Sequence, residues 1–434
     1  MEIAHEYGDL VYLRLGSQEV YLISHPDLIV ELLSVQYASL VKSRFLDRAR
    51  VLLGDGLLTA NGTAHLRKRR LVQPAFHRPR LAGYARHMVE CAEVARRRLH
   101  AGQTVDLGEA MMRLTLAIVG RTLFATDVED HASSVGQAMN TIIELFDVLI
   151  LPFSEHLDKL PFLPVARRLA DARRTLDRTV REIIQQRARE AEDQGDLLSM
   201  LLAARDEEGG RLTDAEVRDE VLTLFLAGHE TTANALTWTW LLLARNPECE
   251  RRMHEEIDEV LGGRLPEFED VPALRYTERV LAEAMRLYPP AWALGRRAIA
   301  PVHLAGHTLL PGSVFVLSPY VTHRDDRWWP EPEHFDPDRF LVDSRPKFAY
   351  FPFGGGPRVC IGERFAWMEG VLLLATLAQR WRFRLHPDTR VDIHPQITLR
   401  PRYPLRFTVE GRLPQTNQFP PRETGDEPDG DIHH

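Results

Sequence analysis

The chain has 434 residues, with 44% hydrophobic and 27% charged positions, and its 54 Lys and Arg against 62 Asp and Glu give a net charge of −8. This is the composition of an ordinary globular protein. Its three cysteines are too few for a disulfide framework or a four-thiolate zinc or iron–sulfur site. The acidic balance argues against nucleic-acid binding, which depends on phosphate neutralisation by Lys and Arg. We therefore expect a cytoplasmic monomer that binds no nucleic acid and has neither a signal peptide nor a transmembrane segment.

The first elements are expected to be a β-hairpin and a helix. Apolar alternation in residues 11–15 and 20–24 flanks the turn sequence GSQE, and HPDLIVELL then opens a helix. From about residue 62 to residue 245 the apolar residues recur at helical spacing. Within this stretch Thr213 and Glu216 form a capping-box sequence, which predicts a long helix that reaches Asn246, before Pro247.

The remaining elements mix strands and helices. Residues 309–320 and 397–409 are typical of strands, and an apolar helix follows Cys360. We predict a mainly α fold of the α+β type, in which a large helical domain carries a small β-rich subdomain and a long central helix. Residues 1–410 are expected to form one domain, and the polar, acidic residues 411–434 a disordered C-terminal tail.

The most informative local sequence is FPFGGGPRVCIGERFAWMEG, residues 351–370. Three consecutive glycines and a proline make a loop with few side chains, and Cys360 lies where this loop meets the start of the apolar helix. The amides of a helix N-terminus and the nearby Arg358 favour a thiolate over a thiol. A lone cysteine is usually a small buried hydrophobe, and we interpret Cys91 and Cys249 in this way. At Cys360 the glycines instead indicate that a large flat group lies against the backbone, as a thiolate-ligated haem does.

This segment resembles the haem-binding loop of the cytochrome P-450 family of monooxygenases. The residues that carry the resemblance are Phe353, Gly356, Arg358, Cys360 and Gly362. It implies that haem b is the cofactor and that Cys360 is the axial ligand of the haem iron. Three further segments match the family in the same order along the chain. The additional helix that family members commonly carry before the first hairpin is not evident, since the hairpin begins by Asp9.

The first of these segments is AGHETT, residues 227–232, in the middle of the long helix. A glycine, an acid and hydroxyls within an apolar turn reduce helix stability. Either Thr231 bonds back to a preceding carbonyl and Glu230 has a structural partner, or both serve chemistry. The resemblance implies chemistry: Glu230 and Thr231 would be an acid–alcohol pair that relays protons beside the oxygen site. Ala227 and Gly228 would leave room over the haem.

The second segment is EAMR, in which Glu283 and Arg286 are three residues apart on one helical face and can pair. An isolated pair of this kind is commonly a solvated surface bridge worth about 0.2–0.5 kcal/mol. In the family the pair joins the arginine of a downstream segment, here Arg339 in PDRF, in a buried network behind the cysteine loop. The resemblance thus implies that these three residues are structural, needed for haem insertion and not for turnover.

The third segment is HLRKRR, residues 65–70. His65 and Arg69 are one turn apart on a helical face, and the family uses these positions to hold haem propionates. The other basic residues of the segment face elsewhere, either as a solvated surface or as a docking site for an acidic electron-transfer partner.

Arg296 and Arg358 complete the cationic set that the resemblance implies, because a guanidinium pairs with a carboxylate bidentately. Arg297 neighbours Arg296, and only one of the two can point inward. We choose Arg296, because Gly306 follows it at the spacing usual in the family.

A haem-thiolate monooxygenase is therefore the leading interpretation, one that hydroxylates or epoxidises a hydrophobic small molecule with O2. No flavin or ferredoxin module follows, so NAD(P)H would supply electrons indirectly, through ferredoxin and ferredoxin reductase or a flavodoxin-type donor. The alternatives are a peroxygenase or isomerase on the same fold and a haem-based gas-binding sensor. Peroxygenases and isomerases typically lack the acid–alcohol pair, and a sensor needs no proton relay and commonly carries an output domain.

The substrate would be a fatty acid, a terpenoid or a carotenoid, because the positions that contact substrate in the family are mostly apolar here. These positions are the loop at 45–58, Phe225, Ala291, Trp292, Ala293, Leu294, Ile397 and Thr398. The same side chains could equally pack the core. Residues 149–153 could form a mobile access lid or a buried helix end.

Overall fold

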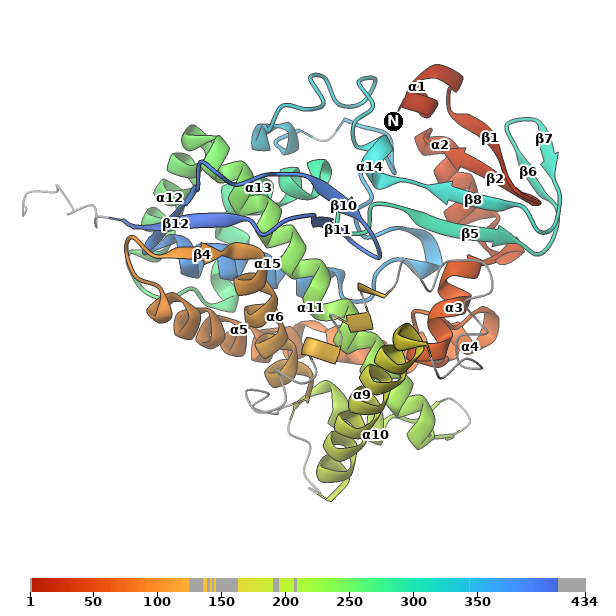
Figure 1. Cartoon of the computed structure of the whole chain (residues 1–434), viewed down its shortest axis with the longest axis horizontal. Helices are drawn as coiled ribbons and strands as arrows, with labels where there is room; N and C mark the ends of the chain where they lie inside the picture. Colours follow the sequence, from red (N-terminus) through yellow and green to blue (C-terminus); the bar gives the residue numbers. More distant parts are fainter. Residues whose placement is uncertain are drawn as a thin grey trace, which may run out of the picture.

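A computed structural model describes residues 2–124, 136–138, 141–142, 144–145, 163–189, 195–206, 209–342 and 344–412. The protein is mainly helical with small sheets, as predicted (Figure 1). The α-helices are α1 (Glu2–Tyr7), α2 (Pro26–Val30), α3 (Arg44–Leu53), α4 (Gly62–Val72), α5 (Arg78–Arg98), α6 (Leu107–Phe124), α9 (Pro164–Arg189), α10 (Leu197–Ala203), α11 (Asp214–Arg245), α12 (Pro247–Leu261), α13 (Arg275–Leu287), α14 (Pro319–Thr322) and α15 (Glu363–Ala378).

Short helical turns and strands connect these helices. The turns are η1 (Glu31–Val35), η2 (Tyr37–Ser39), η3 (Gln73–Phe76), η5 (Phe268–Ala273), η6 (Pro337–Phe340) and η7 (Gly356–Arg358). The strands are β1 (Leu10–Leu15), β2 (Gln18–Ile23), β3 (Leu40–Lys42), β4 (Thr104–Asp106), β5 (Leu294–Ala298), β6 (Val302–Leu304), β7 (His307–Leu309), β8 (Val314–Leu317), β9 (Trp381–Leu385), β10 (Ile393–Pro395), β11 (Leu399–Pro401) and β12 (Arg406–Gly411).

A five-stranded sheet forms one end of the molecule, in the order β1-β2-β8-β5-β3 (Figure 1). The predicted hairpin is confirmed: β1 and β2 pair antiparallel, with Leu10 opposite Ile23. β8 then adds parallel to β2, and its alternating side chains place Phe315 and Leu317 inside. One expectation from the sequence was wrong, because a short helix, α1, does precede the hairpin.

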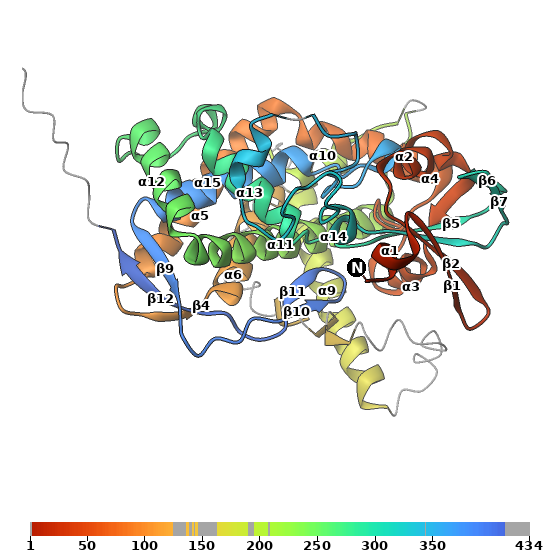
Figure 2. The ribbon, with the colours of Figure 1, turned by 90° about the horizontal axis from the view of Figure 1, so that it is seen from above.

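The long helix α11 runs through the middle of the molecule and packs against α6, α13 and α15 (Figure 2). The predicted capping box is confirmed, since Thr213 Oγ1 accepts from the amide of Glu216 and the Glu216 carboxylate accepts from the amide of Thr213. Its 32 residues give a length of about 48 Å. A helix of this length crosses the molecule, so its middle turns lie near the centre and can hold a site there (Figure 2).

Two hydrophobic cores meet at the cysteine loop, residues 351–362. Phe348 and Phe351 belong to the smaller core, which lies under the five-stranded sheet. Phe353 and Ile361 pack against the larger core, between the helices. The loop is thus fixed from both sides, and Cys360 lies between the two cores.

The C-terminal strands close the helical part. β12 lies between β4 and β9, and β10 pairs with β11 in a separate hairpin. β12 continues to Gly411, and Arg412 donates to the carbonyl of Ala378 and to Asp258. The first two residues of the predicted tail are therefore part of the fold, and residues 413–434 lie outside the described residues.

Candidate functional site

The cysteine loop is held by its own backbone and by α15. The amide of Cys360 donates to the carbonyl of Phe353 at 3.0 Å, and the amide of Gly354 donates to Phe351 O at 2.9 Å. The ring of Phe353 packs 5.7 Å from that of Trp367, on the first turns of α15. These contacts place Cys360 immediately before the helix, as the sequence predicted.

The loop glycines have a reason that the sequence did not reveal. A Cβ on Gly355 would lie 1.9 Å from the Phe348 ring, and one on Gly356 would lie 1.9 Å from the carbonyl oxygen of Leu33 in η1. Gly356 also has a φ of +66°, which L side chains rarely adopt. These glycines therefore allow close packing of the loop against the sheet side of the molecule. Gly362 is different, because its Cβ would stand 4.0 Å from Cys360 Sγ without a clash.

The Cys360 thiol is accessible, although protein surrounds it. Burial raises the pKa of this thiol to about 11, while the Gly362 amide and Arg69 act in the opposite direction. Without a bound metal the Cys360 side chain is therefore a thiol and not the expected thiolate. The cation that lowers its pKa is Arg69 and not Arg358. Coordination to a metal deprotonates a thiol outright, which is how such a cysteine becomes a thiolate ligand.

The middle of α11 has one accessible face. Ala227 is exposed and Thr231, one turn later, is half-buried, although the helix around them is buried. Gly228 differs from the expectation, since its missing Cβ would lie 3.0 Å from Val119 on α6. Gly228 therefore allows the two helices to approach, and the exposed Ala227 provides open space. Phe225, expected at the substrate, is buried.

Glu230 and Thr231 have different partners. The Thr231 hydroxyl donates to the carbonyl of Ala227 at 2.7 Å. Glu230 is only 1% exposed, and its Oε1 accepts a hydrogen bond of 2.6 Å from Thr398, in the turn between β10 and β11. Both structural explanations that the sequence left open are thus realised, and neither contact prevents the two groups from also serving chemistry.

Four basic side chains gather on the sheet side of the cysteine loop. We call them the cation cluster: Lys42 on β3, His65 on α4, Arg296 on β5 and Arg358 on η7. Lys42 and Arg296 are register partners in the sheet, so two basic side chains stand directly opposite each other, which is unfavourable when both are protonated. Sequence reasoning missed Lys42, because its position opposite Arg296 depends on a sheet pairing between distant segments.

Burial of these basic groups beside one another disfavours their protonated forms. Burial lowers the pKa of Lys42 to about 6, with further lowering by Arg358 and Arg296 that Glu220 only partly offsets. Burial and the neighbouring cations lower the pKa of His65 to about 4. Burial and Arg358 lower the pKa of Arg296 to about 10. Such a cluster is suited to an anionic group, and the two carboxylates of haem fit this donor set.

The structure distinguishes the two adjacent arginines. Arg296 is 8% exposed and points inward. Arg297 is 29% exposed, and its Nη2 lies 3.6 Å from the Asp47 carboxylate. Arg69, also expected at the propionates, donates to the carbonyl of Val359 at 2.7 Å. It fastens α4 to the cysteine loop on the thiol side.

The remaining basic residues of α4 are mostly paired. Arg67 lies 2.9 Å from both Asp206 and Glu216. Lys68 is buried, with its Nζ 3.6 Å from Glu220 on α11. These two residues join α4 to neighbouring segments, which contradicts a solvated or docking face at both positions. Arg70 is exposed.

Behind the loop, Glu283 and Arg286 form the pair that the sequence predicted, and both are completely buried. Arg286 donates to the two carboxylate oxygens at 2.7 and 2.8 Å. Arg339 Nε lies 3.4 Å from Glu283 Oε1. Arg286 also donates to the carbonyl of His323, whose Nε2 accepts from the amide of Phe351 at 2.9 Å. A continuous network therefore joins α13 to the cysteine loop.

The other expected substrate contacts lie where α13 leads into β5 and near the C-terminus. Ala291, Trp292, Ala293, Leu294 and Ile397 are all half-buried. Trp292 donates its indole N–H to the carbonyl of Gln396 at 2.9 Å, so part of its surface serves to join the two segments. Residues 149–153, the expected lid, lie outside the described residues.

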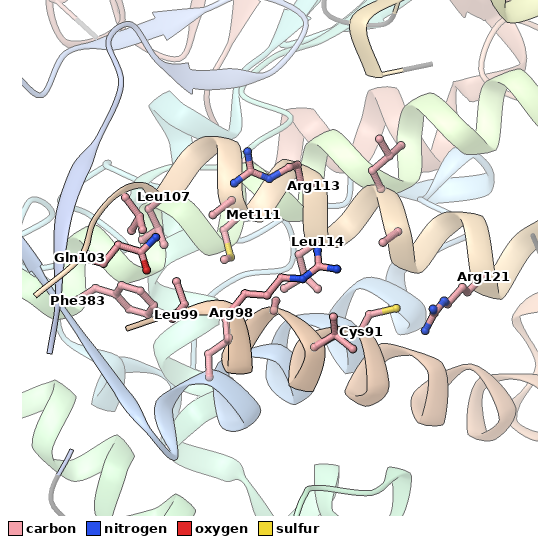
Figure 3. A pocket seen from close by; sticks show the side chains of 17 residues that line it. Cys91, Arg98, Leu99, Gln103, Leu107, Met111, Arg113, Leu114, Arg121 and Phe383 are labelled. Atoms are coloured by element: carbon pink, nitrogen blue, oxygen red, sulfur yellow. The ribbon is translucent and has the colours of Figure 1, made fainter. Parts of the chain in front are cut away.

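A second feature is a groove of about 510 Å³ between α5 and α6 (Figure 3). Leu107, Met111 and Leu114 line it, together with Cys91, which is buried as expected of a packing residue. None of the predicted site residues lines this groove. Among the described residues, no helix combines the length and apolar character that crossing a bilayer requires.

Comparison with known proteins agrees with this geometry. A sequence model of the family described as cytochrome P-450 matches residues 1–409. Cyclooctatin synthase of Streptomyces melanosporofaciens is 43% identical over 412 residues, which cover 94% of this chain and 89% of that protein. Pentalenene oxygenase of Streptomyces avermitilis is 40% identical, with 94% and 91% covered. Cyclooctat-9-en-7-ol 5-monooxygenase of S. melanosporofaciens is 39% identical, with 88% and 84% covered. These matches show that the chain belongs to the cytochrome P-450 family of haem-containing monooxygenases.

Proposed function

We propose that this protein is a haem-thiolate monooxygenase that hydroxylates or epoxidises a terpenoid with electrons from separate donor proteins. The observation that supports it best is the set of groups around the cysteine loop. An accessible thiol lies between the two cores, and four basic side chains, whose pKa values burial lowers, lie on one side of it. A thiol and a cluster of cations are what a dianionic porphyrin with an iron centre requires.

When bound, haem supplies the iron centre that activates O2 for insertion into the substrate. Cys360 would hold the iron as its thiolate ligand. The cation cluster would hold the two propionates, and Arg69 would fix the thiol side of the loop. The backbone of Phe353, Gly356 and Gly362 would form the loop surface, and the accessible face of α11 at Ala227 would lie across the cofactor.

Glu230 and Thr231 would supply protons during turnover. A hydroxyl can accept a proton on one side while it donates on the other, and a carboxyl group can both take up and release a proton. Thr231 lies on the same face of α11 as the exposed Ala227 and can present its hydroxyl there. We infer that Glu230 delivers protons to this hydroxyl and that Thr231 orients them.

The substrate class rests on two observations. The accessible side chains Ala291, Ala293, Leu294 and Ile397 are apolar, which favours a hydrocarbon-like ligand. The named relatives take their names from pentalenene, cyclooctatin and cyclooctat-9-en-7-ol, which are terpenoids. We therefore place a terpenoid ahead of a fatty acid or carotenoid.

The electrons would come from ferredoxin and its reductase or from a flavodoxin-type donor, with NAD(P)H as the ultimate source. The family match covers residues 1–409 and so accounts for nearly all of the chain.

The first experiment measures the absorption spectrum of the reduced, haem-loaded protein under CO. A thiolate opposite CO shifts the main haem band to longer wavelength than a histidine ligand does. We expect this shifted band in the wild type and its loss in Cys360→Ser, with Cys249→Ser as the matched control. An unshifted band in intact wild-type protein would exclude Cys360 as the ligand and with it the proposed function.

The second experiment titrates the ferric protein with cyclic terpenes and, in parallel, with fatty acids. We expect terpenes to shift the iron from low spin to high spin, because a hydrophobic ligand displaces water from the site. A shift with fatty acids alone would keep the monooxygenase and overturn the substrate class.

A further inference from the structure

Thr398 lies in the turn between β10 and β11, where this turn meets the middle of α11. Its hydroxyl donates to Glu230 Oε1 at 2.6 Å and accepts from Asn234 Nδ2 at 3.0 Å. All three side chains are buried. From sequence, Thr398 was expected to touch the substrate, but its hydroxyl is committed to α11.

The direction of these hydrogen bonds is fixed by chemistry. The amide nitrogen of Asn234 can only donate, so the Thr398 oxygen must accept from it. A hydroxyl has a single proton, and this proton is therefore left for the carboxylate of Glu230. A hydrogen bond to a carboxylate is stronger than one between neutral groups, and more so when it is shielded from water. Glu230 is thus held in one orientation, as an acceptor.

The turn that carries Thr398 is itself fixed by contacts that do not involve Glu230. The indole N–H of Trp238 donates to the carbonyl of Leu399, and the amide of Leu399 donates to the carbonyl of Pro290, both at 2.9 Å. The indole N–H of Trp292 donates to the carbonyl of Gln396, also at 2.9 Å. Thr398 is therefore a rigid anchor, and the side chain of Glu230 adapts to it.

The orientation of Glu230 matters because of where Thr231 points. Thr231 shares the face of α11 that Ala227 leaves accessible, whereas Glu230 is buried against the turn. A proton can pass from the acid to the alcohol only if the carboxyl group occupies a defined position. In this structure that position is set by Thr398.

We propose that Thr398 is a positioning residue, which orients the carboxylate of Glu230 for proton delivery toward Thr231. This inference rests on the proposed function, since it concerns the same relay. It also changes the role of Thr398 from a substrate contact to a support for the acid. Ile397, its neighbour in the turn, keeps the predicted contact with substrate.

The test compares haem-loaded Thr398→Val with Thr398→Ser. Valine keeps the shape and removes the hydroxyl, whereas serine keeps the hydroxyl. We expect Thr398→Val to increase the peroxide released per NAD(P)H by roughly three- to tenfold, a fraction of the ~10²–10⁴ that a proton-transfer group contributes. Thr398→Ser should retain the coupling of the wild type. Thr239→Val, at a buried threonine on α11, is the matched control and should leave coupling unchanged.

Two further measurements separate a positioning role of Thr398 from a substrate contact and from a role independent of Glu230. The dissociation constant for substrate, from the spin-state titration of the ferric protein, should be the same in wild type and Thr398→Val. The double variant Thr398→Val/Glu230→Gln should release no more peroxide than Glu230→Gln alone, because residues that act as one unit are not additive. Ile397→Ala, in contrast, should weaken substrate binding and add to Glu230→Gln.

Wild-type coupling in Thr398→Val would overturn the proposal, as would additive effects of the two substitutions. A weaker substrate affinity with unchanged peroxide release would return Thr398 to the substrate contacts. These outcomes presuppose a wild-type protein that shows the shifted CO band and couples NAD(P)H to product. A wild-type protein without the shifted CO band or without coupled product formation would instead overturn the proposed function.

Discussion

Two groups of buried charges flank the cysteine loop, and they differ in how they are neutralised. Behind the loop, Glu283 receives two hydrogen bonds from Arg286 and one from the amide of Asp336. In the cation cluster, Lys42 and Arg296 stand opposite each other in a sheet. The first group is complete within the chain. The second consists of basic groups only, and burial lowers the pKa of each of them.

Buried charges that hold the fold and buried charges that bind a ligand can be separated by the sign of their neighbours. A buried pair with good geometry stabilises a particular arrangement, and removing one partner leaves a charge that neither water nor protein compensates. A buried cluster of one sign is unfavourable by itself and becomes favourable when an ion of opposite sign binds. The network behind the loop therefore holds the fold, and the cation cluster is suited to hold a ligand.

The largest effect is expected from Glu283→Ala. The substitution leaves Arg286 buried with no carboxylate partner, a change that costs about 3–5 kcal/mol. Since the same network reaches the cysteine loop through His323 and Phe351, we expect almost no haem-loaded protein after purification. The measurement is haem content per chain, together with the midpoint of thermal unfolding.

Glu248→Ala is the matched control for Glu283→Ala. Glu248 also pairs with an arginine three residues later on a helix, Arg251, but this pair lies at the surface. Its loss should leave haem content unchanged. Normal haem content in Glu283→Ala would show that the buried pair is no more important than the exposed one.

A smaller effect is expected from Arg296→Leu. If Arg296 holds a propionate, its loss removes a hydrogen bond between charged groups, worth about 1.5–3 kcal/mol. Haem should then dissociate roughly tenfold faster or more, measured by transfer to an excess of an apo-globin. Arg297→Leu should dissociate at the wild-type rate, because Arg297 faces Asp47. Equal rates for the two variants would contradict the assignment of Arg296.

The two regions also differ in how far the sequence could predict them. The spacing of Glu283 and Arg286 predicts their pairing, because residues three apart on a helix are neighbours. The family motif adds Arg339. The hydrogen bonds from the amide of Asp336 and to the carbonyl of His323 could not be read from any local pattern, since they depend on how separate segments pack.

The cation cluster was only partly predictable. His65, Arg296 and Arg358 are in recognisable motifs, whereas Lys42 follows an unremarkable strand sequence and enters the cluster through its register with Arg296. The same holds for Glu230, whose partner Thr398 is 168 residues away. Long-range pairing is where local sequence patterns carry the least information.

The loop glycines show a different limit. A glycine in a sequence shows that a side chain is absent, but the sequence does not show which neighbouring group occupies the space. Here the backbone of Leu33 and the ring of Phe348 occupy these positions, so Gly355 and Gly356 are explained by packing within the chain. The thiol of Cys360 is similar. Only the structure shows that burial raises its pKa by more than the Gly362 amide, at the start of the helix, lowers it.

A third buried group, Glu369 on α15, tests whether every uncompensated charge indicates a ligand. Both of its oxygens are buried, and the nearby Thr232 hydroxyl only partly offsets the effect of that burial on the pKa of the carboxyl group. Burial raises the pKa of Glu369 from 4.5 to about 8. This carboxyl group avoids an uncompensated charge by keeping its proton.

We predict a pH-dependent stability difference between the wild type and Glu369→Gln. Below pH 4.5 both the folded and unfolded wild-type chains are protonated at this position, and the difference is constant. Between that pH and about 8 the unfolded chain ionises and the folded protein does not. The wild type therefore loses stability relative to the variant as pH rises, by up to about 1.4 kcal/mol per pH unit. Denaturant unfolding at several pH values measures this slope, and parallel curves for the two proteins would contradict it.

The smallest effect is expected within the network itself, from Arg339→Met. Arg339 approaches Glu283 only to 3.4 Å, and it donates to the carbonyls of Pro330 and Glu331 near the surface. These carbonyls can bond to water after the substitution, and Glu283 retains both hydrogen bonds from Arg286. We therefore expect a loss of about 1 kcal/mol and nearly normal haem content. Arg286→Met should instead resemble Glu283→Ala, because Glu283 would lose its bidentate partner. If Arg339→Met and Arg286→Met lost haem equally, the three residues would act as one unit and the network could not be divided into a buried pair and a peripheral support.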